Sequence, residues 1–341
     1  MRTLTLGLGL LSLATLASVG CARAPESHNK VTRAALTGGT VLVPWGAEGL
    51  AFEPGGDESR ARGPQALTFS RHGDSYLVLD GLASRVVEIG GDGSMRVHVQ
   101  EAPRDADGMA LSKQGELAFH RAVAQQIDVF DGRGRFSGSV PVPPSAHEAT
   151  TVHLLSQGRV MLEHPYQERY LLGSPNVPRQ PELVVASARE GIADDFREVG
   201  YQVSVGRDDE PAVTELGRAP VFDGNVVLRE MHPTEVDQGS LKYKSVAVMD
   251  LGKAASARIF GVVGTNLCAV LEHVDPEATV IDVKREVVCV DAAGHRELAR
   301  FKIETSKLYT PRQELVFDGR RVGQALPTEQ GLALRTVEVS K

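Results

Sequence analysis

The sequence contains few cysteine and aromatic residues. Its 341 residues include three cysteines and one tryptophan, and aromatic residues make up 5% of the chain. With so few rings, no stacking platform for single-stranded nucleic acid is expected. No block of basic residues is present either, and the 44 acidic residues outnumber the 37 basic ones. Because phosphate binding needs a concentrated positive patch, we expect no nucleic-acid partner.

Common catalytic motifs are also missing. The sequence has no Gly-x-Ser-x-Gly nucleophile elbow, no His-Glu-x-x-His zinc helix and no glycine-rich phosphate-binding loop. These absences argue against the common hydrolase and nucleotide chemistries.

The one long apolar run lies near the N-terminus. Arg2 precedes an apolar stretch from Leu4 to Leu16, and the small residues Ala17-Ser18-Val19-Gly20 lead to Cys21. The stretch is too short to span a bilayer comfortably, so residues 1–20 are predicted to be a secretory signal peptide.

This segment resembles the lipobox of bacterial lipoproteins, in which the cysteine is lipidated and becomes the new N-terminus. The small residues ending in Gly20-Cys21 carry the resemblance, and Ser18 departs from it because that family prefers Leu, Val or Ile there. The resemblance implies an exported protein of the bacterial cell envelope, anchored to the outer membrane by a lipid on Cys21. Residues 21–35 would be a flexible tether. Simple secretion with an incidental cysteine is the alternative.

The strongest pattern in the rest of the sequence is a β-type unit that recurs at about forty-two residues. Its clearest copies run from Gly63 to Val99 and from Asp107 to Val140. Each has four apolar runs separated by turns such as Gly91-Asp92-Gly93, which supply the positive-φ residues of tight hairpins. Such four-stranded antiparallel units must stack to bury both faces, and the closed stack is a β-propeller.

Weaker copies follow the two clear ones. Asp250 and Asp291 each follow an apolar run, and Glu230 and Glu272 also lie one repeat length apart. A surplus of residues around 165–219 enlarges one blade, and long loops on repeat scaffolds often carry function. The expected blades are 63–101, 104–142, 146–208, 215–262 and 264–305, with a last blade in 309–341.

The last blade has about three strands of its own, and the N-terminal run Leu36–Val43 would supply the fourth. Closing the ring in this way removes exposed sheet edges. The prediction is an all-β fold. It is a single six-bladed β-propeller domain of four-stranded antiparallel blades over residues 36–341, closed by an N-terminal strand that joins the last blade.

The first repeat resembles an NHL repeat. Gly63-Pro64, the segment Gly73–Asp80 and the segment Ser84–Ile89 carry this resemblance, while Gln126 stands where the family's arginine would fall in the second copy. The ending Gln324–Arg335 resembles the closing blade of six-bladed, TolB-like propellers. The resemblance implies the fold and a surface for binding proteins, peptides or glycans, and it brings no catalytic residues.

The two remaining cysteines fall on runs predicted to be neighbouring strands. If Cys268 faces Cys289, then Glu272 faces Arg285, so the register is self-consistent. A disulfide is the preferred interpretation for an exported chain, and two buried thiols are the alternative.

Acidic and imidazole residues recur where the second strand of each blade ends. They would lie on one face, near the mouth of the central channel, and could together hold a divalent cation. The alternative is that polar residues simply end strands at loops. The candidates are Asp80, His120, Glu163, His164, Glu230, His232, Glu272 and His273.

The sequence therefore favours a monomeric, envelope-anchored propeller that acts without a cofactor as a non-catalytic binding or scaffold module for a protein, peptide or glycan. The alternative is a metal-dependent propeller hydrolase or lyase, similar to a lactonase, that uses the Glu/His ring.

Overall fold

The computed structural model describes most of the chain beyond the N-terminal segment. The predicted signal peptide, the tether with Cys21 and much of the expected surplus around 165–219 lie outside the described residues. All described residues belong to one compact unit, 33–341. Within them, no helix is long and apolar enough to cross a membrane. The described ranges are 39–56, 59–147, 151–155, 158–163, 169–175, 177–183, 200–207, 210–211, 224–237, 240–274 and 283–339.

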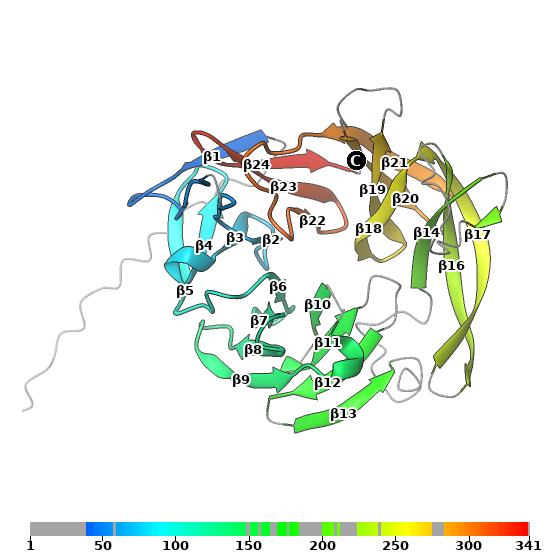
Figure 1. Cartoon of the computed structure of the whole chain (residues 1–341), viewed down its shortest axis with the longest axis horizontal. Helices are drawn as coiled ribbons and strands as arrows, with labels where there is room; N and C mark the ends of the chain where they lie inside the picture. The colour runs from blue at the N-terminus through cyan, green and yellow to red at the C-terminus, as the bar shows by residue number, and fades with distance from the viewer. Residues whose placement is uncertain are drawn as a thin grey trace, which may run out of the picture. The chain divides into compact units, whose positions relative to one another are not determined.

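The described strands form six four-stranded sheets in which all neighbours are antiparallel (Figure 1). The first three sheets are β2 (Ala66–Phe69), β3 (Ser75–Asp80), β4 (Arg85–Gly90), β5 (Met95–Gln100); β6 (Gly108–Leu111), β7 (Leu117–Arg121), β8 (Gln126–Phe130), β9 (Phe136–Pro141); and β10 (Thr151–Leu154), β11 (Val160–Glu163), β12 (Arg169–Ser174), β13 (Val177–Leu183). The other three are β14 (Gly200–Arg207), β15 (Glu210–Pro211), β16 (Gly224–Asp237), β17 (Ser240–Ala254); β18 (Ser256–Val263), β19 (Asn266–Val274), β20 (Val283–Asp291), β21 (Arg296–Ile303); and β22 (Leu315–Phe317), β23 (Arg321–Thr328), β24 (Gly331–Glu338), β1 (Gly39–Pro44).

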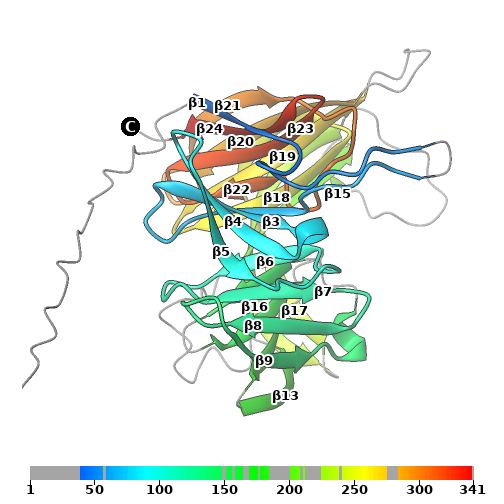
Figure 2. The same cartoon turned by 90° about the vertical axis from the view of Figure 1, so that its left-hand side faces the viewer.

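The sheets are arranged as in a propeller, and five of them have their first strand nearest the centre (Figure 1). Strand β2 contacts β6 and β22, β6 contacts β10, and β18 contacts β14 and β22. Figure 2 shows the first sheet lying over the second. The predicted all-β propeller of small antiparallel sheets is therefore confirmed.

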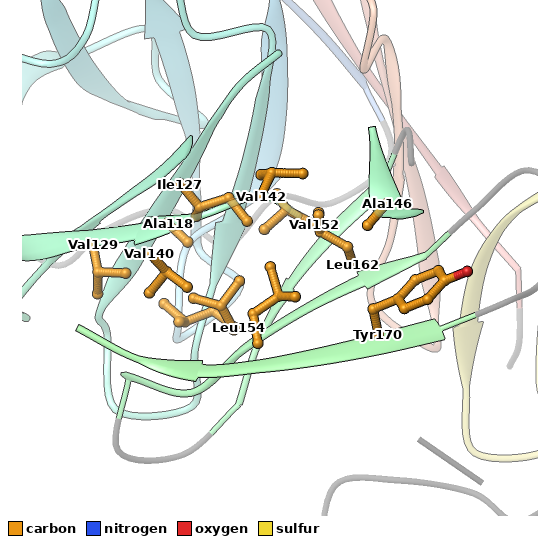
Figure 3. Close-up of a cluster of buried hydrophobic side chains, with 12 residues drawn as sticks. Ala118, Ile127, Val129, Val140, Val142, Ala146, Val152, Leu154, Leu162 and Tyr170 are labelled. Carbon is orange, nitrogen blue, oxygen red and sulfur yellow. The ribbon is translucent and has the colours of Figure 1, made fainter. Parts of the chain in front are cut away.

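Alternating side chains explain why neighbouring sheets stack. Along β3, Tyr76 and Val78 join an apolar cluster shared with the last sheet, whereas Leu77 and Leu79 join a cluster shared with the second sheet. Because strand side chains alternate between the two faces, one strand contributes to two cores. The cluster between the second and third sheets is built in the same way, with Ile127 and Val140 packed toward Val152 and Leu162 (Figure 3).

The predicted count of six blades needs correction. Five of the sheets have four strands in blade order, from the centre outward. The fourth sheet has the order β15-β14-β16-β17, so its fourth strand is the two-residue β15 on the inner edge and no described strand lies outside β17. The described residues thus form five regular blades and one irregular sheet.

Two predicted blade boundaries were also wrong. Strand β14 was expected to end the third blade, and it begins the fourth sheet by pairing with β16. Strand β18 was expected to end the fourth blade, and it is the first strand of the fifth sheet. The sequence markers Glu230 and Asp250 lie on the β16–β17 hairpin, so they located that hairpin correctly but carried no information about the strands on either side of it.

The predicted closure by the N-terminal run is confirmed for its described part. Strand β1 pairs with β24 from Gly39 opposite Thr336 to Pro44 opposite Gly331. Val43 is buried in the core between the last and first sheets, and the indole Nε1 of Trp45 donates a hydrogen bond to the carbonyl of Thr328 at 2.9 Å. A side chain at Gly331 would collide with the carbonyl oxygen of Val43, so glycine permits this close approach.

The predicted disulfide is also present. Cys268 and Cys289 are bonded, with Cα atoms 4.1 Å apart, and Glu272 lies opposite Arg285 as the register required. Both cysteines are fully buried in the cluster between the fifth and last sheets.

Candidate functional site

The acidic and imidazole residues predicted to ring the channel mouth occupy different sheets. Asp80 and Glu163 end β3 and β11 as predicted, and His120 lies next to the last residue of β7. Glu272 and His273 are near the end of β19. Glu230 departs from the prediction because β16 continues past it, so this residue lies in mid-strand opposite Tyr201 and Val246.

Several of these residues are held by neighbouring groups. The carboxylate of Asp80 accepts hydrogen bonds from the backbone N–H of Ala51 at 3.2 Å and from Nε of Arg85 at 2.9 Å. Burial raises the pKa of Asp80, and the Arg85 and Ala51 hydrogen bonds oppose that rise. This carboxylate anchors the segment after β1 to the first blade.

Four other residues of the predicted ring also have partners nearby in the fold. Nδ1 of His120 lies 3.2 Å from Asp107, and Nε2 of His153 lies 2.7 Å from Glu163. Ser256 Oγ donates to Glu272 at 2.7 Å, and His273 lies 3.3 Å from Glu286.

The described residues do not bring these side chains together as metal ligands. No three His, Cys, Asp or Glu side chains form a group that could hold a metal ion within the described ranges. His164 and the side chain of His232 lie outside the described part of the chain. The metal interpretation of these eight residues therefore stays a prediction.

A different polar site lies between the first and second blades. It is an open hollow of about 270 Å³ between the 3₁₀ turn η1 (Gly81–Ala83) and the link that leads from β5 to β6. Its lining combines two arginines, a glutamine and two aspartates with small residues, and consists of Arg62, Gly63, Gln65, Gly81, Leu82, Arg104, Asp105, Ala106 and Asp107.

The two aspartates of the hollow are already paired with cations. Arg121 binds both oxygens of Asp105, at 2.7 and 3.0 Å, and these hydrogen bonds lower the pKa of that carboxyl. Asp107 forms an ion pair with Arg312 from the link before β22, besides its contact with His120. Both carboxylates thus act as fixed, neutralised parts of the wall.

The two arginines of the hollow are more accessible. Nε of Arg104 donates to Ser84 Oγ at 2.7 Å, which orients the guanidinium without neutralising it. Arg62 lies 3.3 Å from Glu53, and both side chains are more than half exposed, so this pair contributes little. Arg104 therefore offers positive charge to a ligand in the hollow.

A tyrosine with a buried hydroxyl supports one wall of the hollow. The ring of Tyr309 stacks on Phe52 with centroids 6.3 Å apart, and its hydroxyl packs against Gly63, where any Cβ would lie 2.2 Å from the oxygen. Burial raises the pKa of Tyr309, with a further contribution from the charge of Asp80. This buried hydroxyl has no hydrogen-bond partner among the described residues. Tyr309 is thus neutral and fixes the position of the Gly63 backbone.

Sequence reasoning missed this hollow, although a weak signal was available. Arg62 and Arg104 both lie in the links that precede the first strand of a blade, four residues before Ala66 and Gly108 respectively. A comparison of link positions between repeats would have found this pair of guanidinium groups.

Comparisons with known proteins found solved structures of low similarity to this chain. No family model matches the sequence, and no curated protein matches it. A member of the duf4221 family from Bacteroides vulgatus matches with a TM-score of 0.45 and 8% identity, over 90% of this chain and 99% of that chain. Virginiamycin B lyase from Staphylococcus aureus matches with a TM-score of 0.41 and 12% identity, over 81% and 94%.

A gluconolactonase from Xanthomonas campestris matches with a TM-score of 0.37 and 12% identity, over 89% of this chain and 100% of that chain. These scores and identities are too low to carry an argument about function. The propeller assignment rests on the sheets of this chain, and the NHL and TolB-like resemblances stay predictions.

Proposed function

We propose that this protein is an exported, lipid-anchored β-propeller that acts as a non-catalytic binding module for a protein, peptide or glycan in the bacterial cell envelope. The observation that carries the proposal is the open hollow between the first two blades. Its walls are held by ion pairs, and the contact described for the Arg104 guanidinium is with a serine hydroxyl and not with a carboxylate. Such a surface suits recognition of a polar group on a larger molecule.

The proposed role is tested by screening the purified full chain on peptide and glycan arrays in the presence of EDTA, with parallel elemental analysis. A binding module should retain its ligand in EDTA and should purify with less than about one metal ion per ten chains. A stoichiometric divalent metal together with loss of binding in EDTA would contradict the proposal and support the lactonase-like alternative.

The proposed anchor makes a separate prediction. Cys21→Ala should move the protein from the membrane fraction into the soluble periplasmic fraction, because a single lipid-modified residue at the end of a tether carries the attachment. Fractionation followed by immunoblotting measures this shift. Cys268→Ala serves as the matched cysteine control and should stay membrane-bound if it folds. Unchanged partitioning of the Cys21 variant would refute the anchor.

A further inference from the structure

We infer that the hollow between the first and second blades binds a carboxylate of an acidic peptide, held by Arg104 and Arg62. This inference rests on the proposed binding function and assigns a ligand chemistry to its site. It follows from the balance of charges in the hollow, from the orientation of Arg104 and from the composition of the lining.

The pairing of the charges favours an anion at Arg104. Arg121 binds Asp105 as well as Asp128, and Arg312 pairs with Asp107, so both lining carboxylates are already engaged by other arginines. Among the described residues, the side chain of Arg104 hydrogen-bonds to a serine hydroxyl and not to a carboxylate. The exposed Arg62–Glu53 pair is weak and can exchange Glu53 for a ligand carboxylate.

Arg104 is held in a defined orientation. Its Nε donates to Ser84 Oγ, and Ser84 itself sits in the left-handed conformation that ends the turn η1. The carbonyl of Arg104 packs so closely on Gly81 that a Cβ there would lie 3.2 Å from it. With Nε engaged, the terminal nitrogens of the guanidinium stay available, and they match the two oxygens of a carboxylate.

The lining favours a peptide over a glycan. Among the described residues no aromatic ring lines the hollow, so the stacking of a sugar face on a ring is not available from them. The side-chain amide of Gln65 is tied to the carbonyl of Gly63 at 2.9 Å, which leaves its carbonyl oxygen to accept a peptide N–H.

Isothermal titration of an N-acetylated hexaglutamate peptide into the full chain carrying Cys21→Ala tests the inference. Hexaglutamate should bind and hexaglutamine should not. Arg104→Gln should weaken binding about tenfold, since a hydrogen-bonded charge pair is lost. Arg62→Gln should weaken binding less than Arg104→Gln does. Arg104→Lys should bind more tightly than Arg104→Gln and less tightly than the parent, because lysine keeps the positive charge but lacks the two guanidinium nitrogens that bind both carboxylate oxygens.

Arg133→Gln is the matched control, because Arg133 is an exposed arginine in the β8–β9 turn of the second blade, outside the hollow. This variant loses the same charge and should bind as the parent does. Equal binding by the Arg104→Gln and parent chains overturns the inference, as does equal binding of hexaglutamine. Tighter binding of oligogalacturonate or inorganic phosphate than of hexaglutamate overturns the assignment to a peptide.

The failure of this inference is distinguishable from the failure of the proposed function. If Arg104→Gln leaves hexaglutamate binding unchanged while array ligands still bind in EDTA, the protein is a binding module that uses another surface. If neither the arrays nor hexaglutamate give binding, both are wrong. Thermal midpoints of the Arg104 variants should match the parent because this side chain is exposed, which excludes misfolding as the cause of a loss.

Discussion

Deletion of residues 36–45 should lower the thermal midpoint of the propeller by about 10 °C or more, or abolish folding. The deletion removes β1, which pairs with β24 along its whole length and completes the last blade. It also removes Val43 from the core and breaks the Trp45–Thr328 hydrogen bond. Loss of these apolar contacts and ladder hydrogen bonds costs at least about 5 kcal/mol. Thermal unfolding followed by circular dichroism measures the change.

Two controls identify closure as the cause. Deletion of residues 22–34, which precede the paired run, should leave the unfolding transition unchanged. Val43→Asp keeps the chain length and places a charge in the apolar cluster with Leu50 and Leu332, so it should destabilise strongly as well. An unchanged, cooperative transition after deletion of 36–45 would show that β1 is a linker and that the ring does not depend on it.

The sequence predicted those parts of the fold that local chemistry determines. Hairpin turns such as Gly91-Asp92-Gly93 set the register of β4 with β5, and alternation along β3 set its two buried faces. The cysteine pairing was predictable for the same reason, because a hairpin register that opposes Glu272 to Arg285 must also oppose Cys268 to Cys289. In each case the information lies within one hairpin.

The irregular fourth sheet was not predictable in this way. The pairing of β14 with β16 joins segments separated by a long stretch of sequence, and no local turn signal specifies it. Strands β16 and β17 are 14 and 15 residues long, about twice the length of the strands in the first blade, so their hairpin does not follow the repeat. The break in the repeat period predicted an enlarged blade around 165–219, but it did not show that β14 pairs with β16.

The candidate site was missed because the spacing of residues along the sequence does not show which of them lie close together in the fold. Arg62, Arg104 and Arg312 lie in three different links, and the fold brings them to one hollow and its rim. The predicted Glu/His set had a regular spacing, yet residues such as Glu163 and Glu272 are engaged with His153 and Ser256 beside them. Partners of this kind depend on tertiary contacts, which the sequence pattern does not reveal.

The buried ion pair between Arg285 and Glu314 should be the most sensitive polar contact of the described propeller. Arg285 is 8% exposed and Glu314 4%, and the arginine binds both carboxylate oxygens, with Nη1 3.2 Å from Oε2. Glu314→Leu removes both carboxylate hydrogen bonds from a buried guanidinium, which costs about 3–5 kcal/mol. The thermal midpoint should therefore fall by roughly 10 °C. The more exposed Glu272, 3.7 Å from Arg285, is too distant to replace the lost hydrogen bonds.

The double variant Arg285→Met/Glu314→Leu separates the cost of an unpaired charge from the value of the pair. Because apolar side chains of similar size replace a buried ion pair at little cost, the double variant should recover most of the stability that Glu314→Leu loses.

Glu304→Leu is the matched surface control. Glu304 is 67% exposed and pairs with Arg335 at 2.8 Å, so its loss should cost less than about 1 kcal/mol. If Glu314→Leu unfolds at the same temperature as Glu304→Leu, the pair does not join the fifth and last sheets in solution. If the double variant is as unstable as the single one, Glu314 stabilises the interface through contacts other than its charge.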